Sequence, residues 1–179
     1  MKRFNIKNGF TLIELLVTIA IIGILSSILY ANFESAREQS RDKVRMTSLK
    51  ELQLAVELYK SQNGQYPAQG CGTAGSFAGP GLAGGSGFAS CSTYITGLTP
   101  DFISELPTDP NQENETDKGF YYSSDGNSYK IMVYDSVETL TVDNYGDEFA
   151  RCPKSGGSDC PATAPANTYA VYSSGAEQW

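Results

Sequence analysis

A single carboxylate, that of Glu14, interrupts an otherwise apolar stretch near the start of the chain. Residues 10–33 read FTLIELLVTIAIIGILSSILYANF, and Glu14 is the only charged side chain among them. A carboxylate buried without a partner in an apolar helix is costly, so an acid in such a place usually marks a function. The structural alternative is that Glu14 only reaches a headgroup boundary near the start of a helix.

Gly9 stands immediately before this stretch and ends a short basic leader. The leader, residues 1–9, reads MKRFNIKNG and has basic side chains but no acid. A cut after Gly9 would create a positive α-amino group on Phe10, a few residues from Glu14. The neighbouring residues therefore favour the functional interpretation of Glu14.

The four cysteines are the other residues with an evident chemistry. None lies in a CxxC motif, and the chain contains no histidine, so a zinc site would need thiolates from two distant loops. Structural disulfides are the better interpretation, and they place this part of the chain outside the cytoplasm. Four cysteines allow three connectivities, and pairing neighbours closes the shortest loops. The predicted pairs are Cys71 with Cys91 and Cys152 with Cys160.

Composition argues against several classes of function. The absence of histidine removes the commonest general base and metal ligand, and no nucleophile motif is recognisable, so we predict no enzyme, no catalytic residue and no cofactor. The formal net charge is −7, with no dense basic run, which argues against nucleic-acid binding through bulk charge. Asp143, Asp147 and Glu148 could ligate calcium through oxygen, but solvated loop acids are favoured and no metal site is predicted.

A very long helix must carry Glu14. The apolar stretch 10–33 is long enough to span a bilayer as a helix. Residues 34–62 contain no Gly or Pro and place Leu49, Leu52, Val56 and Tyr59 on one stripe, which predicts an amphipathic continuation packed on the same domain. Asn63-Gly64 should end the helix.

Residues 63–179 are expected to form a globular head. Its loop 70–91 is rich in glycine and closed by the first cysteine pair; that composition alone cannot pack a core. Residues 120–122 and 129–134 predict a hairpin, and 137–142 and 168–172 are weaker strand candidates. The fold class is therefore α+β, with the long helix packed on a small antiparallel sheet.

Gly9 followed by FTLIELLVTIAIIGIL resembles the N-terminus of type IV prepilins and type II secretion pseudopilins. Residues 58–67, LYKSQNGQYP, resemble the helix exit of the same proteins, and LPTDP at 106–110 is similar too. The C-terminal third lacks the compact acidic calcium loop of major pseudopilins. Its Cys152–Cys160 bracket resembles the disulfide-closed loops of pilins, which favours a pilus subunit.

The resemblance implies how the chain would be processed and assembled. A membrane-embedded prepilin peptidase would cut between Gly9 and Phe10 and methylate Phe10, and an inner-membrane platform would assemble the subunits into a helical homopolymer. The carboxylate of Glu14 would pair with the Phe10 amine of a neighbouring subunit. The precursor would be a single-pass cytoplasmic (inner) membrane protein in contact with lipid, and the assembled form an extracellular pilus or a periplasmic pseudopilus.

Two alternatives stay open on the sequence. Residues that separate a pilus, serving adhesion, motility or uptake, from a secretion pseudopilus are not evident. A monomeric bitopic membrane protein with a binding head is the alternative from another class. That alternative needs neither Glu14 nor a cut after Gly9.

Overall fold

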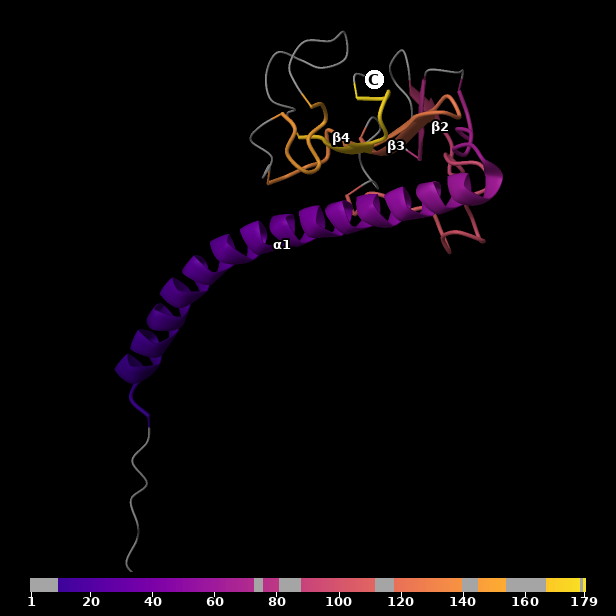
Figure 1. Cartoon of the computed structure of the whole chain (residues 1–179). Helices are drawn as coiled ribbons and strands as arrows, with labels where there is room; N and C mark the ends of the chain where they lie inside the picture. The colour runs from indigo at the N-terminus through magenta and orange to yellow at the C-terminus, as the bar shows by residue number, and fades with distance from the viewer. Residues whose placement is uncertain are drawn as a thin grey trace, which may run out of the picture. The chain divides into compact units, whose positions relative to one another are not determined.

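The protein is described here by a computed structural model, which covers residues 10–72, 76–80, 88–111, 118–139, 145–153, 167–177 and 179. By its internal contacts the chain divides into two units, Met1–Glu38 and Gln39–Trp179. Both units contain part of one helix, α1 (Leu12–Asn63), and the second also contains the sheet (Figure 1).

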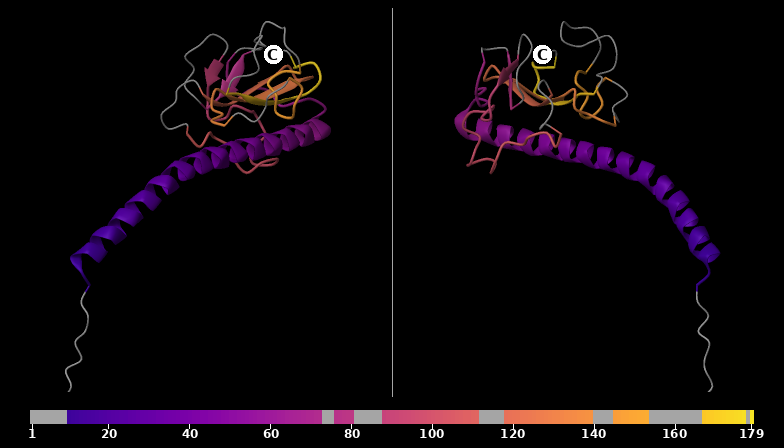
Figure 2. Two further views of the ribbon diagram at one scale, coloured as in Figure 1. Left: turned by 90° about the vertical axis from the view of Figure 1, so that its left-hand side faces the viewer. Right: turned by 180° about the vertical axis from the view of Figure 1, so that it is seen from behind.

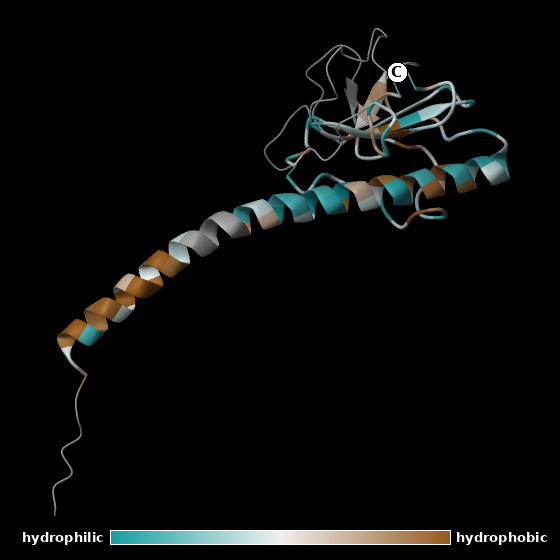
Figure 3. Cartoon of the chain, turned by 60° about the vertical axis from the view of Figure 1, so that its left-hand side comes forward, coloured by the Kyte–Doolittle hydropathy of each residue, from teal (hydrophilic) through white to brown (hydrophobic). Residues whose placement is uncertain are grey.

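Helix α1 has the bounds that the sequence pattern predicts. It ends at Asn63 because Gly64 takes a positive φ of 82°, which glycine adopts without strain, and the Gly64 amide donates to Lys60 O. Figure 3 shows mainly apolar residues in the first turns of the helix, with a hydrophilic position among them, while in the second unit apolar and hydrophilic residues alternate. The helix therefore changes from apolar to amphipathic along its length, as predicted.

The head is built on a five-stranded sheet in the order β2-β1-β3-β4-β5. Strands β3 (Gly119–Ser124) and β4 (Tyr129–Tyr134) form the predicted hairpin, and the Asp125 carboxylate accepts the amides of Asn127 and Ser128 in its turn. Strand β5 (Tyr169–Tyr172) pairs antiparallel with β4 and matches the second weak strand candidate. The four strands β1, β3, β4 and β5 make an antiparallel sheet, and the α+β prediction is confirmed.

The core lies between the sheet and the second half of α1. Leu49, Leu52 and Val56 are fully buried, so the predicted stripe faces the head's own sheet. From the sheet, alternate residues of the three long strands point into the same core: Phe120, Tyr122, Ile131, Val133, Tyr169 and Val171. The intervening residues Tyr121, Lys130 and Met132 are buried as well, so the sheet has no solvent-exposed face in its centre.

Two short strands in the glycine-rich loop were not expected from the sequence. Strands β1 (Phe77–Gly79) and β2 (Phe88–Ser90) pair parallel to each other, and β1 continues the sheet beyond β3. Glycine permits this, because a Cβ on Gly79 would lie 2.3 Å from Phe120 O and 2.5 Å from the Tyr121 ring. Ala78 of β1 is fully buried, so part of the glycine-rich loop joins the core by pairing with β3.

The strand candidate at 137–142 is also wrong for its described part, residues 137–139. The amides of Glu138 and Thr139 donate to the Asp42 carboxylate on α1, so they are not available to a strand ladder. Residues 140–142 lie outside the described part of the chain. The Asp42 side chain accepts the backbone hydrogen bonds that a neighbouring strand would otherwise accept.

The outer edge of β5 is occupied by a loop. The Ala170 amide donates to Phe149 O over 3.0 Å, and Phe149 holds a left-handed φ of 70° to make this contact. Its ring lies 6.1 Å from that of Tyr169 and 5.2 Å from Lys50 Nζ. The loop around Phe149 thus satisfies a backbone amide that β5 would otherwise expose.

The predicted disulfide between Cys71 and Cys91 is present and closes the glycine-rich loop. Replacing both cysteines with serine should cost about 2–4 kcal/mol of unfolding free energy, because the unfolded chain is no longer constrained. Denaturant unfolding followed by tyrosine signals would measure the loss, and hydrogen exchange should increase most between residues 70 and 91. An unchanged midpoint in the double variant would contradict this.

Candidate functional site

The candidate site is the beginning of α1, where the polar groups are satisfied locally. Thr11 caps the helix: its amide and hydroxyl both donate to the Glu14 carboxylate, over 2.8 and 2.7 Å, and the Glu14 amide donates back to the Thr11 hydroxyl over 3.3 Å. This reciprocal arrangement is a capping box, which the sequence Thr-x-x-Glu could have predicted but which we did not identify. The Glu14 carboxylate therefore has a local partner within its own chain.

Two other hydroxyls of this segment, those of Thr18 and Ser27, donate to their own helix backbone. Thr18 Oγ donates to the carbonyls of Glu14 and Leu15, and Ser27 Oγ donates to Ile24 O. Such bonds remove the need for water at these side chains. Glu14 remains the only charged group in an apolar helical segment.

The apolar side chains around Glu14 are exposed on every side of the helix. Phe10 is 80% exposed, Ile13 68% and Ile24 65%, and none of the other large apolar residues from Leu12 to Leu25 is covered by the rest of the chain. A helix that is apolar all round is stable only when lipid or other protein surrounds it. Across the described residues, no helix combines the length and apolar character that crossing a bilayer requires.

The structure describes only some of the predicted site residues. Phe10 and Glu14 are described, whereas Gly9 lies outside the described residues, so the cleavage position stays a prediction. In the uncut chain the Phe10 nitrogen belongs to a peptide bond, so no amine is there to pair with Glu14. Cys152 is buried and disulfide-bonded, but Cys160 lies outside the described residues, and their pairing stays a prediction.

A second polar cluster, in the head, was missed by the sequence analysis. Arg45 is fully buried on α1, and its Nε and Nη2 bond both oxygens of Asp109 at 2.8 Å. Its Nη1 donates to Asp42 at 2.7 Å and to Glu138 at 2.8 Å. The signal was available, because Asp42 and Arg45 continue the spacing of Leu49, Leu52 and Val56 toward the N-terminus.

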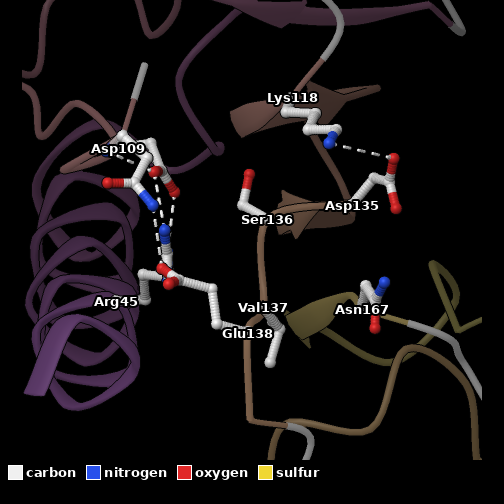
Figure 4. Close-up of a pocket in the computed structure, with 9 residues that line it drawn as sticks. Arg45, Asp109, Lys118, Asp135, Ser136, Val137, Glu138 and Asn167 are labelled. Carbon is white, nitrogen blue, oxygen red and sulfur yellow. Dashed lines mark hydrogen bonds and ion pairs between the residues drawn. The ribbon is translucent and has the colours of Figure 1, made fainter. Parts of the chain in front are cut away.

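This Arg45 cluster joins three segments of the head (Figure 4). Burial alone would lower the pKa of Arg45, but the hydrogen bonds to Asp109, Glu138 and Asp42 raise it above its ordinary value. Arg41 also pairs with Glu138, and a cavity of about 220 Å³ lies beside the cluster. The charged groups of the cluster are paired with one another. The cluster is therefore better suited to hold α1 against the loops that contain Asp109 and Glu138 than to bind a ligand.

The calcium possibility finds little support in the described residues. Asp143 lies outside them, and Glu148 pairs with Lys50 over 2.7 Å. Among the described residues no group of three or more acidic or cysteine side chains is placed to hold a metal ion.

Comparison with known proteins points to the same N-terminal segment. Residues 5–30 match the prokaryotic N-terminal methylation motif. The chain is 34% identical over 67 residues to type II secretion system core protein G of Vibrio cholerae. The aligned residues make up 37% of this chain and 46% of that protein. It is 42% identical over 67 residues to the type IV major pilin protein PilA of Myxococcus xanthus, covering 37% of this chain and 30% of PilA.

A third relative is the type IV wide pilus major component PilA4 of Thermus thermophilus, 43% identical over 58 residues, or 32% of this chain and 44% of PilA4. The chain thus spans less than half the length of these relatives. No solved structure matches it. The segment that contains Gly9, Phe10 and Glu14 thus matches the prokaryotic N-terminal methylation motif, and over about a third of its length the chain is similar to type IV pilins and to type II secretion core protein G.

Proposed function

We propose that this chain is the precursor of a structural subunit of a type IV pilus-like filament, polymerised through its N-terminal helix. The observation that carries the proposal is the apolar, exposed segment around Glu14, inside the matched motif at residues 5–30. Its large apolar residues have no partner surface in the described chain. Burial among the same segments of neighbouring copies would remove them from water.

Before assembly, lipid is the proposed surrounding of the segment. Residues 10–33 are mostly apolar and their only charged side chain is Glu14, so the precursor would be held in the cytoplasmic membrane with its head outside. The disulfide between Cys71 and Cys91 supports an oxidising location for the head. An inner-membrane platform would then transfer the segment from lipid to the filament.

Cleavage by a prepilin peptidase between Gly9 and Phe10 is the first step of this proposal. We expect mature protein from cells to begin at Phe10 with a methylated α-amino group, and a Gly9→Val variant to accumulate as uncut precursor in the membrane. Intact-mass and N-terminal peptide mass spectrometry would measure both. Assembled protein that still contains residues 1–9 would refute the proposal. An intact leader on protein isolated from cells would favour the monomeric bitopic alternative.

A pseudopilus subunit of a type II secretion system is the second candidate, because core protein G of Vibrio cholerae is among the relatives. Deleting the gene would separate the two. Loss of sheared surface filaments with normal secretion of exported proteins indicates a pilus. Intact surface filaments with exported proteins retained inside the cell envelope indicate a pseudopilus.

A further inference from the structure

Asn63 and Gly64, at the end of α1, form a dipeptide with a reactivity of its own. In an asparagine-glycine pair the glycine backbone nitrogen can attack the side-chain carbonyl carbon of asparagine, because glycine has no side chain to hinder the approach. A nitrogen–carbon bond forms, the bond from that carbon to Nδ2 breaks, and ammonia leaves with the amide proton. Water then opens the resulting succinimide ring at either carbonyl and leaves aspartate or isoaspartate.

Burial does not protect this dipeptide. The sequence contains the asparagine-glycine pair twice, at Asn8-Gly9 and at Asn63-Gly64, and the first pair lies outside the described residues. Asn63 and Gly64 are both exposed to water, and a Cβ placed on Gly64 would meet no atom within 4 Å. The reactivity of the pair in the folded chain therefore depends on its conformation and its hydrogen bonds.

Both reacting groups are hydrogen-bonded within the last turn of α1. The Gly64 amide donates to Lys60 O over 2.8 Å, and the Asn63 side-chain Nδ2 donates to Tyr59 O over 3.0 Å. Gly64 has a φ of 82°, the left-handed conformation that closes a helix end. Attack requires the Gly64 nitrogen to lose its proton and to turn toward the Asn63 side chain. Both hydrogen bonds must break before that can happen.

The chain beyond Gly64 is fixed to the sheet and holds the last turn closed. The Tyr66 amide donates to Gly126 O over 2.9 Å, and the Tyr66 ring lies 4.6 Å from the ring of Tyr129. Lys60 Nζ lies 4.0 Å from the centre of the Tyr66 ring, which connects the last turn to the same contact. Figures 1 and 2 show the chain turning back from the end of α1 toward the sheet.

We infer that Asn63 is a deamidation site that the folded chain keeps closed and that reacts only when the last turn of α1 opens. Helix ends open and close far faster than asparagine deamidates, so the rate at Asn63 is the unfolded rate multiplied by the open fraction. The product weakens the turn, because a carboxylate cannot donate to Tyr59 O and is disfavoured at the C-terminal end of a helix. Deamidation is therefore a permanent mark on a chain whose helix end has opened.

The first measurement compares the folded, detergent-solubilised full chain with the same chain unfolded in guanidinium chloride, at one mildly alkaline pH and one temperature. Peptide mass spectrometry measures aspartate and isoaspartate at position 63 and separates them from changes at Asn8. We expect the folded chain to react at least about tenfold more slowly, which corresponds to an opening free energy of ~1.4 kcal/mol. Equal rates in the two states would overturn the inference.

Two matched variants change the stability of the last turn and leave Asn63-Gly64 intact. Ser61 and Gln62 are exposed, so both can be replaced with glycine, which disfavours a helix, or both with alanine, which favours it most. Each folded rate is divided by the rate of the same variant unfolded. We expect the glycine variant to deamidate at Asn63 at least about tenfold faster than the alanine variant on this scale. Equal ratios would show that the last turn does not control the reaction, which contradicts the inference.

Discussion

A Glu14→Leu variant is expected to insert into the membrane and to lose residues 1–9 normally, yet to yield at least about tenfold fewer filaments than wild type. After cleavage the Phe10 α-amino group carries a positive charge at the start of an apolar segment. Buried among neighbouring helices without a carboxylate, that charge would cost several kcal/mol, far more than the tenfold loss requires. Assembly should therefore fail while membrane insertion improves.

The measurement compares sheared filament fractions at equal cellular levels of subunit, with the mature N-terminus checked by mass spectrometry. Thr18→Val is the matched control, because Thr18 lies in the same segment but its hydroxyl bonds only the helix backbone. The control should assemble like wild type. Normal filament amounts from Glu14→Leu would show that the pairing is dispensable and that our account of assembly is wrong.

An Arg45→Met variant should lose about 3–5 kcal/mol of unfolding free energy, because it leaves buried carboxylates without their cation. Asp42 and Asp109 are 3% and 6% exposed, so water cannot replace the guanidinium. Arg41→Met is the matched control: Arg41 is partly exposed, and Glu138 keeps its bond to Arg45. That control should lose only about 1 kcal/mol.

Urea unfolding of the detergent-solubilised chain, followed by near-ultraviolet tyrosine signals, would measure both variants. Repeating it in acid tests the same cluster. Hydrogen bonds from Arg41 and Arg45 lower the pKa of Glu138 from 4.5 to about 2. A lowered folded pKa means that this contribution is complete above about pH 4.5 and is lost as the pH falls toward 2. Equal losses in Arg45→Met and Arg41→Met would contradict the assigned role.

The sequence predicted those parts of the fold that depend on residues close together in the chain. The bounds of α1, the β3–β4 hairpin and the Cys71–Cys91 bridge follow from periodicity, turn residues and loop length. The Arg45 cluster depends on Asp109 and Glu138, which are far from Arg45 in sequence. Neither residue belongs to a periodic pattern from which the contact could be predicted. The same contact explains the wrong strand at 137–139, since Asp42 takes the amides that a strand would use.

The short strands in the glycine-rich loop could not be predicted for a different reason. Glycine-rich composition indicates a segment that cannot pack a core alone, and it contains no strand pattern. At Gly79 the missing side chain lets β1 approach β3 closely. Such an approach depends on neighbours that a single sequence does not reveal. For the candidate site, the residue types identified Glu14. Its bonds to Thr11 could also have been predicted from the Thr-x-x-Glu spacing, which marks a capping box.

The loop at Phe149 has a consequence for how copies of this chain can meet. A sheet edge with unpaired amides is a template on which another copy can add a strand, and repeated addition leads to disordered aggregates. Here the Ala170 amide is already bonded to Phe149 O, so β5 offers no such template at that residue. The Phe149 loop therefore blocks the addition of a strand at that position of β5.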